Sequence, residues 1–297
     1  MKKLTILLLG STGFLGKKLK IELKKNYKII TKNSKTLNLL DFNKLNNFFN
    51  SKKFDIILNC SWLVNSTADD NFIRLKNSKS NLKIGKNLFF LAQKYKIKYF
   101  INISSINVYK PSKFLLSEKN LLKKTYQSSS PEGIAKLNLI KLFNKVDSKK
   151  FKYLNIIFSN LYGFKIRKNL LFLDKVFQNI YLKKKYQIFL PKNFDLKVDY
   201  LYIEDAVSAV NFFLKKLIDQ KIKNKNINIA SGKQYSLKNL IDIIKKEKKF
   251  TIKYFEIKSK NKLSLKPSIQ LAKKYGWEPK ISIDDGIKKT AKIYKKF

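Results

Sequence analysis

The sequence predicts an α/β protein built on a doubly wound parallel sheet. Continuous apolar runs, such as those over 4–9 and 54–58, have the length of strands that are buried on both faces of a sheet. Between these runs, apolar residues recur at helical spacing, as they do over 14–23. Strand and helix alternate in this way through the first half of the chain, which is typical of right-handed βαβ units.

The predicted elements follow one another regularly as far as residue 160, and the pattern is looser beyond it. Strands are predicted over 4–9, 27–30, 54–58, 99–103, 153–158, 186–190, 196–203, 226–229 and 251–255. Helices are predicted over 14–23, after residue 41, and over 72–94, 131–146, 170–182, 204–217, 236–246, 268–275 and 283–294. We therefore expect a first domain of residues 1–164, to which 196–230 return, and a smaller C-terminal α/β lobe within residues 165–297.

The composition is that of a globular protein. The chain has 297 residues, of which 44% are hydrophobic, so it can bury a sizeable core. No apolar run approaches the roughly 20 residues that span a bilayer, and the opening MKKLTILLL is too short for a signal peptide, so we expect a cytoplasmic protein with no membrane partner. A single cysteine, Cys60, and the lack of histidine exclude an internal disulfide, a zinc cluster and a histidine-based triad. No metal site is expected.

The charge is strongly positive, with 65 Lys and Arg against 20 Asp and Glu. Such an excess can indicate nucleic-acid binding. However, the basic residues are spread over the whole chain, and all but Arg74 and Arg167 are lysine. We interpret this as the bias of a coding sequence rich in A and T, and we expect no nucleic-acid partner, although an RNA-binding protein remains a third interpretation. A basic surface would still attract a polyanionic ligand such as a sugar nucleotide.

A glycine turn directly after the first strand is the most informative motif. The glycines of LTILLLGSTGFLG are spaced GxxGxxG between a strand and a helix. In such a turn, one glycine allows the chain to reverse and another allows a pyrophosphate to approach the backbone closely. The remaining glycine allows the helix to pack against the strand. The N–H groups at the helix start then face the phosphates. This context predicts a dinucleotide-binding turn of the Rossmann type. Its candidate cofactor contacts are Gly10, Ser11, Thr12, Gly13, Phe14, Leu15 and Gly16.

The residues after the second strand bear on the choice of cofactor. Dinucleotide folds that bind NAD usually place an acid there, on the ribose hydroxyls. This chain has Thr31 and Lys32 instead, so no carboxylate repels a 2′-phosphate and a lysine is available to pair with it. NADP is therefore slightly favoured over NAD. Asp41, ahead of a short helix, is a further candidate cofactor contact.

Two other strand ends fall on the cofactor side of the predicted sheet. The strand over 54–58 leads into Cys60 and Ser61, and the strand over 99–103 leads into Ser104. Ligands of open α/β sheets bind beyond such carboxyl ends, so these three residues are candidate cofactor contacts. No base is evident beside Cys60, which favours a packing position over a nucleophile.

Seven motifs in order resemble the extended short-chain dehydrogenase/reductases, in particular the NAD(P)-dependent sugar-nucleotide epimerases, dehydratases and reductases. The resemblance covers almost the whole chain. Its motifs are GSTGFLG at Gly10, NLKIGKNLFFLA at Asn81, INISSINVY at Ile101, SNLYG at Ser159, VDYLYIEDAV at Val198, NIASGKQYSLKNLI at Asn228 and YGWEPKISIDDGI at Tyr275. It implies that Asn81 is the central asparagine of the fourth helix and contributes to the cofactor site.

The resemblance also implies the catalytic positions. Ser105 matches the hydroxyl that orients the substrate, and Lys136 matches the lysine that holds the nicotinamide ribose. The tyrosine that exchanges a proton in the family is replaced by Glu132. Several interpretations of Glu132 stay open. It could have no chemical role and only form a capping box with Ser129 or an ion pair with Lys136. It could instead be a substitute acid or base, the position could be misaligned, or another group could supply the proton.

The other group considered is a nearby tyrosine, Tyr126 or Tyr109. On the substrate side, the resemblance places Asn107, Asn160 and Lys197 near the nucleotide sugar. Lys197 lies beside Val198, where relatives often carry arginine, and a buried turn asparagine is the alternative interpretation of Asn160.

The resemblance therefore implies an epimerase or 4-keto reductase of nucleotide-activated sugars, in surface-polysaccharide biosynthesis. A dehydratase is less favoured, because the acidic pair that dehydratases carry after the catalytic hydroxyl is missing from Ser105-Ile106-Asn107. The expected partners are a nucleotide-sugar substrate and a second copy of the chain in a homodimer. The alternative is a family member that binds the cofactor without catalytic activity.

Overall fold

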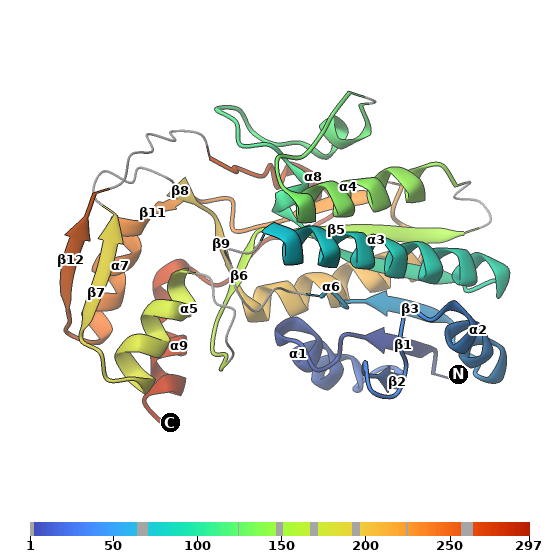
Figure 1. Ribbon diagram of the computed structural model, residues 1–297, viewed down its shortest axis with the longest axis horizontal. Helices are drawn as coiled ribbons and strands as arrows, with labels where there is room; N and C mark the ends of the chain where they lie inside the picture. Colours follow the sequence, from blue (N-terminus) through green and yellow to red (C-terminus); the bar gives the residue numbers. More distant parts are fainter. Residues whose placement is uncertain are drawn as a thin grey trace.

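A six-stranded parallel sheet forms the centre of the protein (Figure 1), in the spatial order β10-β5-β4-β3-β1-β2. The computed structural model describes residues 3–63, 71–123, 125–146, 151–166, 172–191, 197–223, 225–256 and 264–297. The strands of the sheet are β1 (Thr5–Leu9), β2 (Lys28–Lys32), β3 (Ile56–Asn59), β4 (Tyr99–Ser105), β5 (Lys152–Phe158) and β10 (Asn226–Ile229). The predicted doubly wound α/β fold is confirmed.

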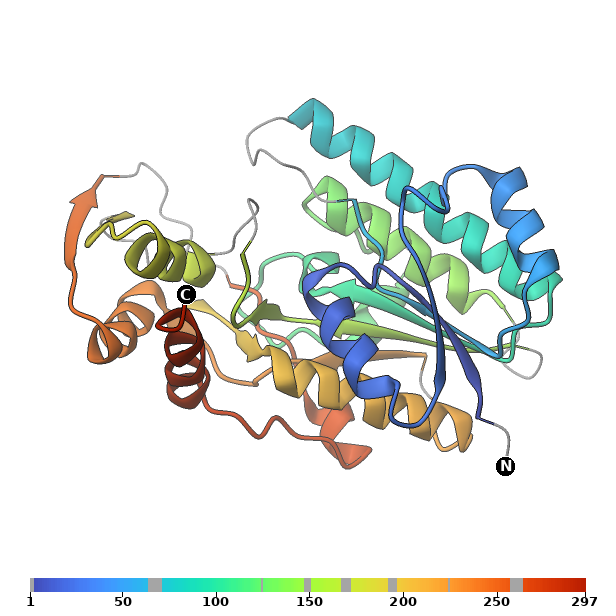
Figure 2. The ribbon, with the colours of Figure 1, turned by 90° about the horizontal axis from the view of Figure 1, so that it is seen from below.

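Both faces of the sheet are covered by helices, as Figure 2 shows. In β1, Ile6 and Leu8 pack into one apolar cluster, and Leu7 and Leu9 pack into another. Alternate residues of a strand face opposite sides, so this unbroken apolar run needs a cover on each side. The first cluster contains apolar side chains of α1 (Phe14–Leu23) and α6 (Ile203–Ile218). The second contains apolar side chains of α2 (Phe42–Ser51), α3 (Asn71–Lys94) and α4 (Pro131–Asn144).

A ladder of side-chain amides crosses four strands of the sheet. Asn59, Asn102, Asn155 and Asn226 are register partners on β3, β4, β5 and β10. Each amide donates to the next, with N···O distances of 3.0, 3.1 and 2.9 Å. All four residues are buried. Buried amides are costly unless they are hydrogen-bonded, so the ladder fixes the register of these strands.

The smaller lobe lies beyond the carboxyl edge of the sheet, at the left in Figure 1. Its elements are α5 (Phe172–Phe177), the π-helical turn η3 (Gln178–Leu182), β7 (Gln187–Pro191), α7 (Leu237–Glu247), β12 (Thr251–Phe255) and α9 (Ile283–Tyr294). Strands β7 and β12 pair in parallel. The remaining short elements are η1 (Ile106–Val108), η2 (Glu118–Leu122), β6 (Asn160–Tyr162), β8 (Lys197–Val198), β9 (Tyr200–Tyr202), β11 (Tyr235–Ser236) and α8 (Gln270–Lys274).

The single strand predicted over 196–203 is wrong. The chain forms β8 and β9 with Asp199 between them, Ile203 already belongs to α6, and residue 196 lies outside the described residues. Asp199 is buried, and its carboxylate accepts hydrogen bonds from the N–H groups of Ser231 and Gly232 at 2.9 and 2.8 Å. A buried carboxylate needs such donors. This interaction breaks the strand, and sequence spacing alone did not indicate it.

The strand order reverses between β1 and β3. From β1 the chain moves to β2 on one side, and then to β3, β4, β5 and β10 on the other. The connections at such a reversal leave in opposite directions, which opens a crevice at the carboxyl ends of the two strands. Gly10 follows β1 and Cys60 follows β3, so both predicted cofactor segments lie at this crevice.

Candidate functional site

The glycine turn has the close packing that its spacing predicts. Gly10 has φ +74°, and an added Cβ there would meet the backbone of Cys60 and Ser61 after β3. An added Cβ on Gly16 would overlap the carbonyl oxygen of Gly10. The Gly13 N–H donates to that same oxygen at 3.0 Å. Only glycine therefore lets the turn lie against both the loop after β3 and the start of α1.

The start of α1 can accept an anion. Gly13 is the N-cap residue, and no side chain caps the helix. Phe14 begins α1, and Leu15 and Gly16 follow within its first turn. The N–H groups of a first helical turn have no partner within the helix and carry the positive end of the helix dipole. This geometry fits the pyrophosphate of a dinucleotide, as the sequence predicts.

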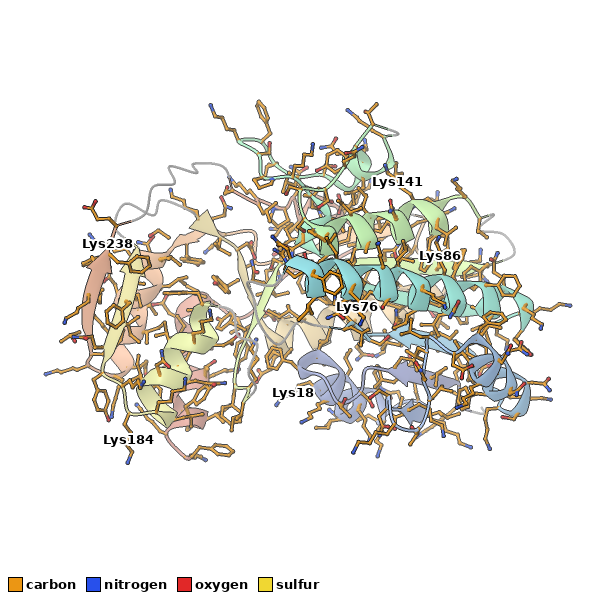
Figure 3. The ribbon with its side chains drawn as sticks, in the orientation of Figure 1. Lys18, Lys76, Lys86, Lys141, Lys184 and Lys238 are labelled. Atoms are coloured by element: carbon orange, nitrogen blue, oxygen red, sulfur yellow. The ribbon has the colours of Figure 1, made fainter. Side chains whose placement is uncertain are left out.

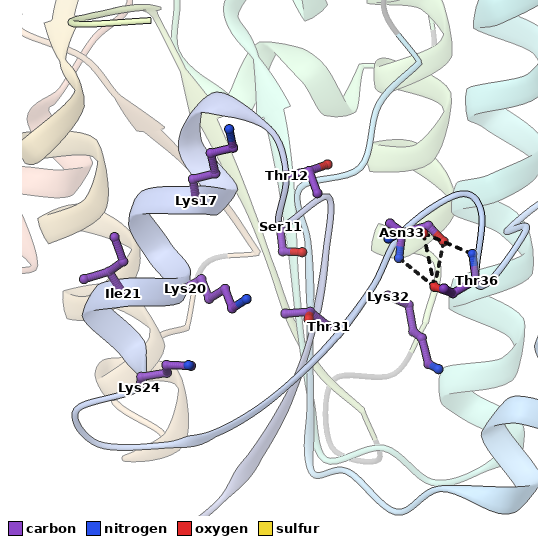
Figure 4. A pocket seen from close by; sticks show the side chains of 10 residues that line it. All are labelled: Ser11, Thr12, Lys17, Lys20, Ile21, Lys24, Thr31, Lys32, Asn33 and Thr36. Atoms are coloured by element: carbon purple, nitrogen blue, oxygen red, sulfur yellow. Dashed lines mark hydrogen bonds between the residues drawn. The ribbon is translucent and has the colours of Figure 1, made fainter.

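A pocket of about 630 Å³ lies between the turn, α1 and the end of β2 (Figure 4). Ser11 and Thr12 line it from the turn, and Thr31 and Lys32 line it from β2. Lys20 projects into it from α1. The remaining lining residues are Lys17, Ile21, Lys24, Asn33 and Thr36. Four lysines and no carboxylate therefore surround the pocket among its described lining residues, which favours an anionic ligand group.

Asp41 is not among the residues that line this pocket. Its carboxylate instead caps α2, where it accepts a hydrogen bond from the Lys44 N–H at 3.0 Å. Aspartate is a preferred N-cap residue because it satisfies an otherwise unpaired helix N–H group. The structure therefore gives Asp41 a local task that its sequence position did not reveal.

The loop after β3 is held by two asparagines. The Asn59 side-chain oxygen accepts hydrogen bonds from the N–H and hydroxyl groups of Ser61. From α3, the buried amide of Asn81 accepts a hydrogen bond from the Leu63 N–H at 2.7 Å and donates to the Leu63 carbonyl at 3.0 Å. Asn81 therefore fixes the loop that passes Gly10. Burial raises the pKa of the Cys60 thiol to about 12, so Cys60 is no thiolate nucleophile.

The end of β4 carries the predicted catalytic hydroxyl. Ser105 is partly buried, and its Oγ accepts a hydrogen bond of 3.4 Å from the N–H of Asn107, whose side chain is exposed. The neighbouring Ser104 is buried, and its hydroxyl has no hydrogen-bond partner among the described residues. The Asn107 carbonyl accepts a hydrogen bond from the Ser128 hydroxyl at 2.6 Å, which ties the end of β4 to the loop before α4.

Glu132 is paired with a residue that the sequence analysis did not select. The Arg74 guanidinium donates to both carboxylate oxygens of Glu132, from Nε at 2.8 Å and from Nη2 at 3.0 Å. These bonds lower the pKa of Glu132, so the carboxylate is ionised at neutral pH. The predicted capping box with Ser129 is wrong, because Ser130 is the N-cap residue and bonds Gly133. The expected ion pair with Lys136 is also wrong.

Lys136 lies one turn after Glu132 on α4. Its Nζ is 3.6 Å from the centroid of the Trp62 ring, which belongs to the loop after β3. The geometry is that of a cation–π contact. Burial lowers the pKa of Lys136 from 10.5 to about 7. Trp62 was not selected from the sequence, although its position directly after the candidate cofactor contacts Cys60 and Ser61 was a usable signal.

The two tyrosines considered as proton donors are held elsewhere. The buried Tyr109 hydroxyl donates to the side chain of Asn228 at 2.9 Å, and burial raises its pKa well above the ordinary value. The Tyr126 hydroxyl accepts a hydrogen bond from the Lys110 N–H at 2.9 Å, and burial raises the pKa of Tyr126 too. In this arrangement, both hydroxyls therefore make hydrogen bonds within the fold.

The predicted substrate side lies at the join with the smaller lobe. Asn160 begins β6, and its side chain donates to the Asp199 carbonyl at 3.2 Å. Lys197 is exposed on β8. Nearby, Lys165 and Asp174 form a buried ion pair of 2.6 Å, and the Lys165 ammonium lies 4.4 Å from the centroid of the Phe14 ring at the start of α1. This buried pair links the lobe to the glycine turn.

Two other findings concern the described residues as a whole. No helix in the described ranges is both long and apolar enough to cross a membrane. Within the same ranges, no group of three or more His, Cys, Asp or Glu side chains is arranged to hold a metal ion.

Known proteins share both the sequence pattern and the fold. GDP-L-colitose synthase from Yersinia pseudotuberculosis is 26% identical to the chain, over 97% of each. The structure of GDP-mannoheptose C4 reductase from Campylobacter jejuni, with NADP bound, covers 100% of both chains at 20% identity, with a TM-score of 0.84. UDP-glucose 4-epimerase from Thermotoga maritima, with UDP-glucose, covers 98% of this chain and 99% of its own at 20% identity, with a TM-score of 0.81.

The family model for the NAD dependent epimerase/dehydratase family matches residues 6–230, from β1 to the end of β10. This match includes the glycine turn, the end of β4 and α4, which carry predicted site residues. It confirms the resemblance that the seven sequence motifs indicated. The chain belongs to the NAD-dependent epimerase/dehydratase family.

Proposed function

We propose that the protein is an NADP-dependent 4-keto reductase or epimerase of a nucleotide-activated sugar. The observation that carries this proposal is the glycine turn at the carboxyl end of β1, which opens onto the lysine-lined pocket between α1 and the end of β2. The relatives support the substrate class, since their names describe a GDP-sugar synthase, a GDP-sugar C4 reductase and a UDP-sugar epimerase. The cofactor would supply hydride chemistry at a sugar carbon.

NADP is the cofactor that the pocket favours. A 2′-phosphate would bring negative charge to the end of β2, where Lys32 lines the pocket and Lys20 reaches across from α1. Lysine binds phosphate as a point charge and does not need the forked geometry of arginine. With no carboxylate among the described lining residues, nothing there repels the phosphate.

The remaining site residues have positions that fit the proposed reaction. Ser105 would hold the sugar oxygen from the end of β4, and Lys136 would approach the nicotinamide ribose from α4. Asn107, Asn160 and Lys197 would contact the nucleotide sugar. We further propose that residues 1–164, with 196–230, form the cofactor domain and that the other residues of 165–297 form the substrate lobe.

We also propose that the protein takes part in surface-polysaccharide synthesis in the cytoplasm. We further propose that it forms a homodimer, in which two copies of the chain pair through α3 and α4. These helices lie side by side (Figure 1). Phe72 and Leu75 on α3 and Ile134 on α4 have exposed apolar side chains. Analytical ultracentrifugation tests this, because Leu75→Glu with Ile134→Glu would give a monomer.

A family member that binds the cofactor without turnover is the second candidate. The ion pair between Arg74 and Glu132 favours it, because an ionised carboxylate held by two hydrogen bonds cannot donate a proton. An RNA-binding protein is less well supported. The six lysines labelled in Figure 3 lie on α1, α3, α4, α7 and the loop after η3, so they are distributed over the molecule, whereas RNA binding favours a continuous basic face.

Calorimetry and turnover separate these candidates. We expect the purified protein to bind NADPH and to oxidise it when given a GDP-linked or UDP-linked 4-keto-6-deoxyhexose, which is followed by the loss of reduced-nicotinamide absorbance. Binding without turnover, together with turnover gained by Glu132→Tyr, would establish the second candidate. A folded protein that binds neither NADPH nor NADH would refute both.

A further inference from the structure

The start of α1 is contacted by the chain segment that follows β6. The ring centroid of Phe14, the first residue of α1, lies 4.4 Å from the Lys165 ammonium. A Cβ added to Gly163 would lie 3.4 Å from Cζ of Phe14, so the same ring also packs against the backbone of this glycine. The aromatic side chain of the glycine turn is therefore held by a segment from the second half of the chain.

Lys165 is itself fixed by three elements of the smaller lobe. Its ammonium pairs with the Asp174 carboxylate of α5 at 2.6 Å, and the two side chains are only 5% and 1% exposed. Its backbone carbonyl accepts hydrogen bonds from the Gln178 side chain of η3 at 2.9 Å and from the Tyr294 hydroxyl of α9 at 2.7 Å. Both the backbone and the charged end of Lys165 are thus anchored, which determines where the ammonium lies relative to Phe14.

Stability alone does not explain this buried pair. Lys165 is 6% exposed, which makes it the most buried lysine among the described residues. Taking an ammonium and a carboxylate out of water costs about as much as their attraction returns, so apolar residues of similar size often serve a fold equally well. The ammonium does hold the ring beside it, because a cation is attracted to the face of an aromatic ring. The contact with Phe14 is therefore the distinctive effect of the pair.

We infer that Lys165 and Asp174 are positioning residues of the cofactor site. Their ion pair holds the Phe14 ring, and the ring holds the first turn of α1, whose N–H groups are the ones that a pyrophosphate would meet. The inference rests on the proposed function, because it takes the glycine turn as the place where the dinucleotide binds. It goes beyond that function in making NADPH affinity depend on a charged pair that is buried in the smaller lobe.

The double variant Lys165→Met with Asp174→Leu tests the pair without leaving an unpaired charge in the interior. Circular dichroism and thermal unfolding should show a folded protein, while calorimetric titration should show the Kd for NADPH raised about fivefold or more. The matched control is Lys289→Met with Glu204→Leu, which removes an exposed ion pair between α9 and α6 and should change this Kd by less than about twofold. A folded double variant that binds NADPH as tightly as wild type would overturn the inference.

Phe14→Leu tests the other end of the contact and leaves the ion pair in place, so it decides the question even where the double variant does not fold. We expect it to raise the Kd for NADPH by a similar factor. The triple variant should bind no more weakly than either parent, because both changes remove the same contact. An unchanged Kd in Phe14→Leu, or two losses that multiply in the triple variant, would show that the pair does not act through this ring.

Hydrogen exchange measures the positioning in the protein without any ligand. The Lys17 N–H donates to the Gly13 carbonyl at 3.0 Å, in the first turn of α1. In the double variant, this amide should exchange about fivefold faster or more, because the turn has lost its support. Unchanged protection there would contradict the inference.

Steady-state kinetics with a GDP-linked 4-keto-6-deoxyhexose separate positioning of the cofactor from loss of the fold. In the double variant, the KM for NADPH should rise while kcat at saturating NADPH changes by less than about twofold, as for lost uniform binding. A fall in kcat at unchanged KM would count against the inference. A wild type that binds neither NADPH nor NADH would refute the proposed function instead, and hydrogen exchange would still show whether the pair orders the start of α1.

Discussion

Arg74 and Glu132 are 58 positions apart in the chain, and they meet through two hydrogen bonds that join α3 to α4. Glu132 is the residue that the family resemblance aligns with a proton-donating tyrosine. Arginine and carboxylate match in a planar, bidentate geometry that lysine cannot reproduce. Of the 65 basic residues in the chain, two are arginines, and one of these two pairs with Glu132. This indicates that the pair needs the bidentate geometry of arginine and not its charge alone.

The first prediction concerns the stability of this pair. Arg74→Ala should lower the free energy of unfolding by about 1 kcal/mol at neutral pH, because the pair is partly exposed and screened by solvent. The pKa of Glu132 is lowered in the folded state, so the pair stabilises the fold fully above the ordinary pKa of 4.5 and loses this effect as the pH falls through the lowered value.

Thermal unfolding at neutral pH and at about pH 3 checks this prediction. The difference between wild type and Arg74→Ala should shrink in acid. Lys289→Ala, which breaks the exposed pair with Glu204, is the control and should change stability by less than about 0.5 kcal/mol. A difference for Arg74→Ala that is equally large in acid would show that its origin is not the ion pair.

The second prediction concerns the glycine turn. Gly16→Ala places a Cβ against the Gly10 carbonyl, so the turn must open and NADPH affinity should fall by more than about tenfold. Gly85→Ala is the matched control, because its added Cβ meets the flexible end of Leu139 between α3 and α4. It should cost about 1 kcal/mol of stability and leave NADPH binding unchanged. Calorimetric titration measures the affinity, and equal affinity in Gly16→Ala and wild type would contradict the prediction.

The third prediction concerns the choice between NADP and NAD. Lys20→Ala and Lys32→Ala should each weaken NADPH binding by about tenfold, which corresponds to the loss of one charged hydrogen bond, with little effect on NADH. Lys18→Ala on the same helix is the control, since Lys18 does not line this pocket. Binding of both nucleotides is measured by fluorescence. If the two variants weaken NADH as much as NADPH, the lysines do not read the 2′-phosphate.

The fourth prediction concerns the amide ladder. Asn102→Ala leaves the Asn59 amide without its acceptor and the Asn155 oxygen without its donor, so the fold should lose about 3 kcal/mol. Asn47→Ala on the exposed side of α2 is the control, and it should cost less than about 0.5 kcal/mol. Urea unfolding with an unchanged m-value measures both. Equal midpoints for the two variants would show that the ladder is not important for stability.

Local patterns determined most of the fold. The helix over 14–23 and the strands over 226–229 and 251–255 occur at the predicted bounds, because apolar periodicity and flanking turn residues act within one element. The strand predicted over 196–203 failed because Asp199 binds a loop that lies more than thirty residues further along the chain. Long-range hydrogen bonds of this kind leave no mark on local periodicity.

The sequence by itself determined the glycine turn, the order of strands and helices, and the family, and it predicted Glu132 at the position of the family's tyrosine. Only the tertiary structure decided which side chains Glu132 and Lys136 contact. Arg74 comes from another helix, and Trp62 comes from the loop after β3, so both contacts exist only after α3, α4 and the sheet have packed. The physical reason is that charge state depends on burial and on neighbours in space, and those neighbours are distant in the chain.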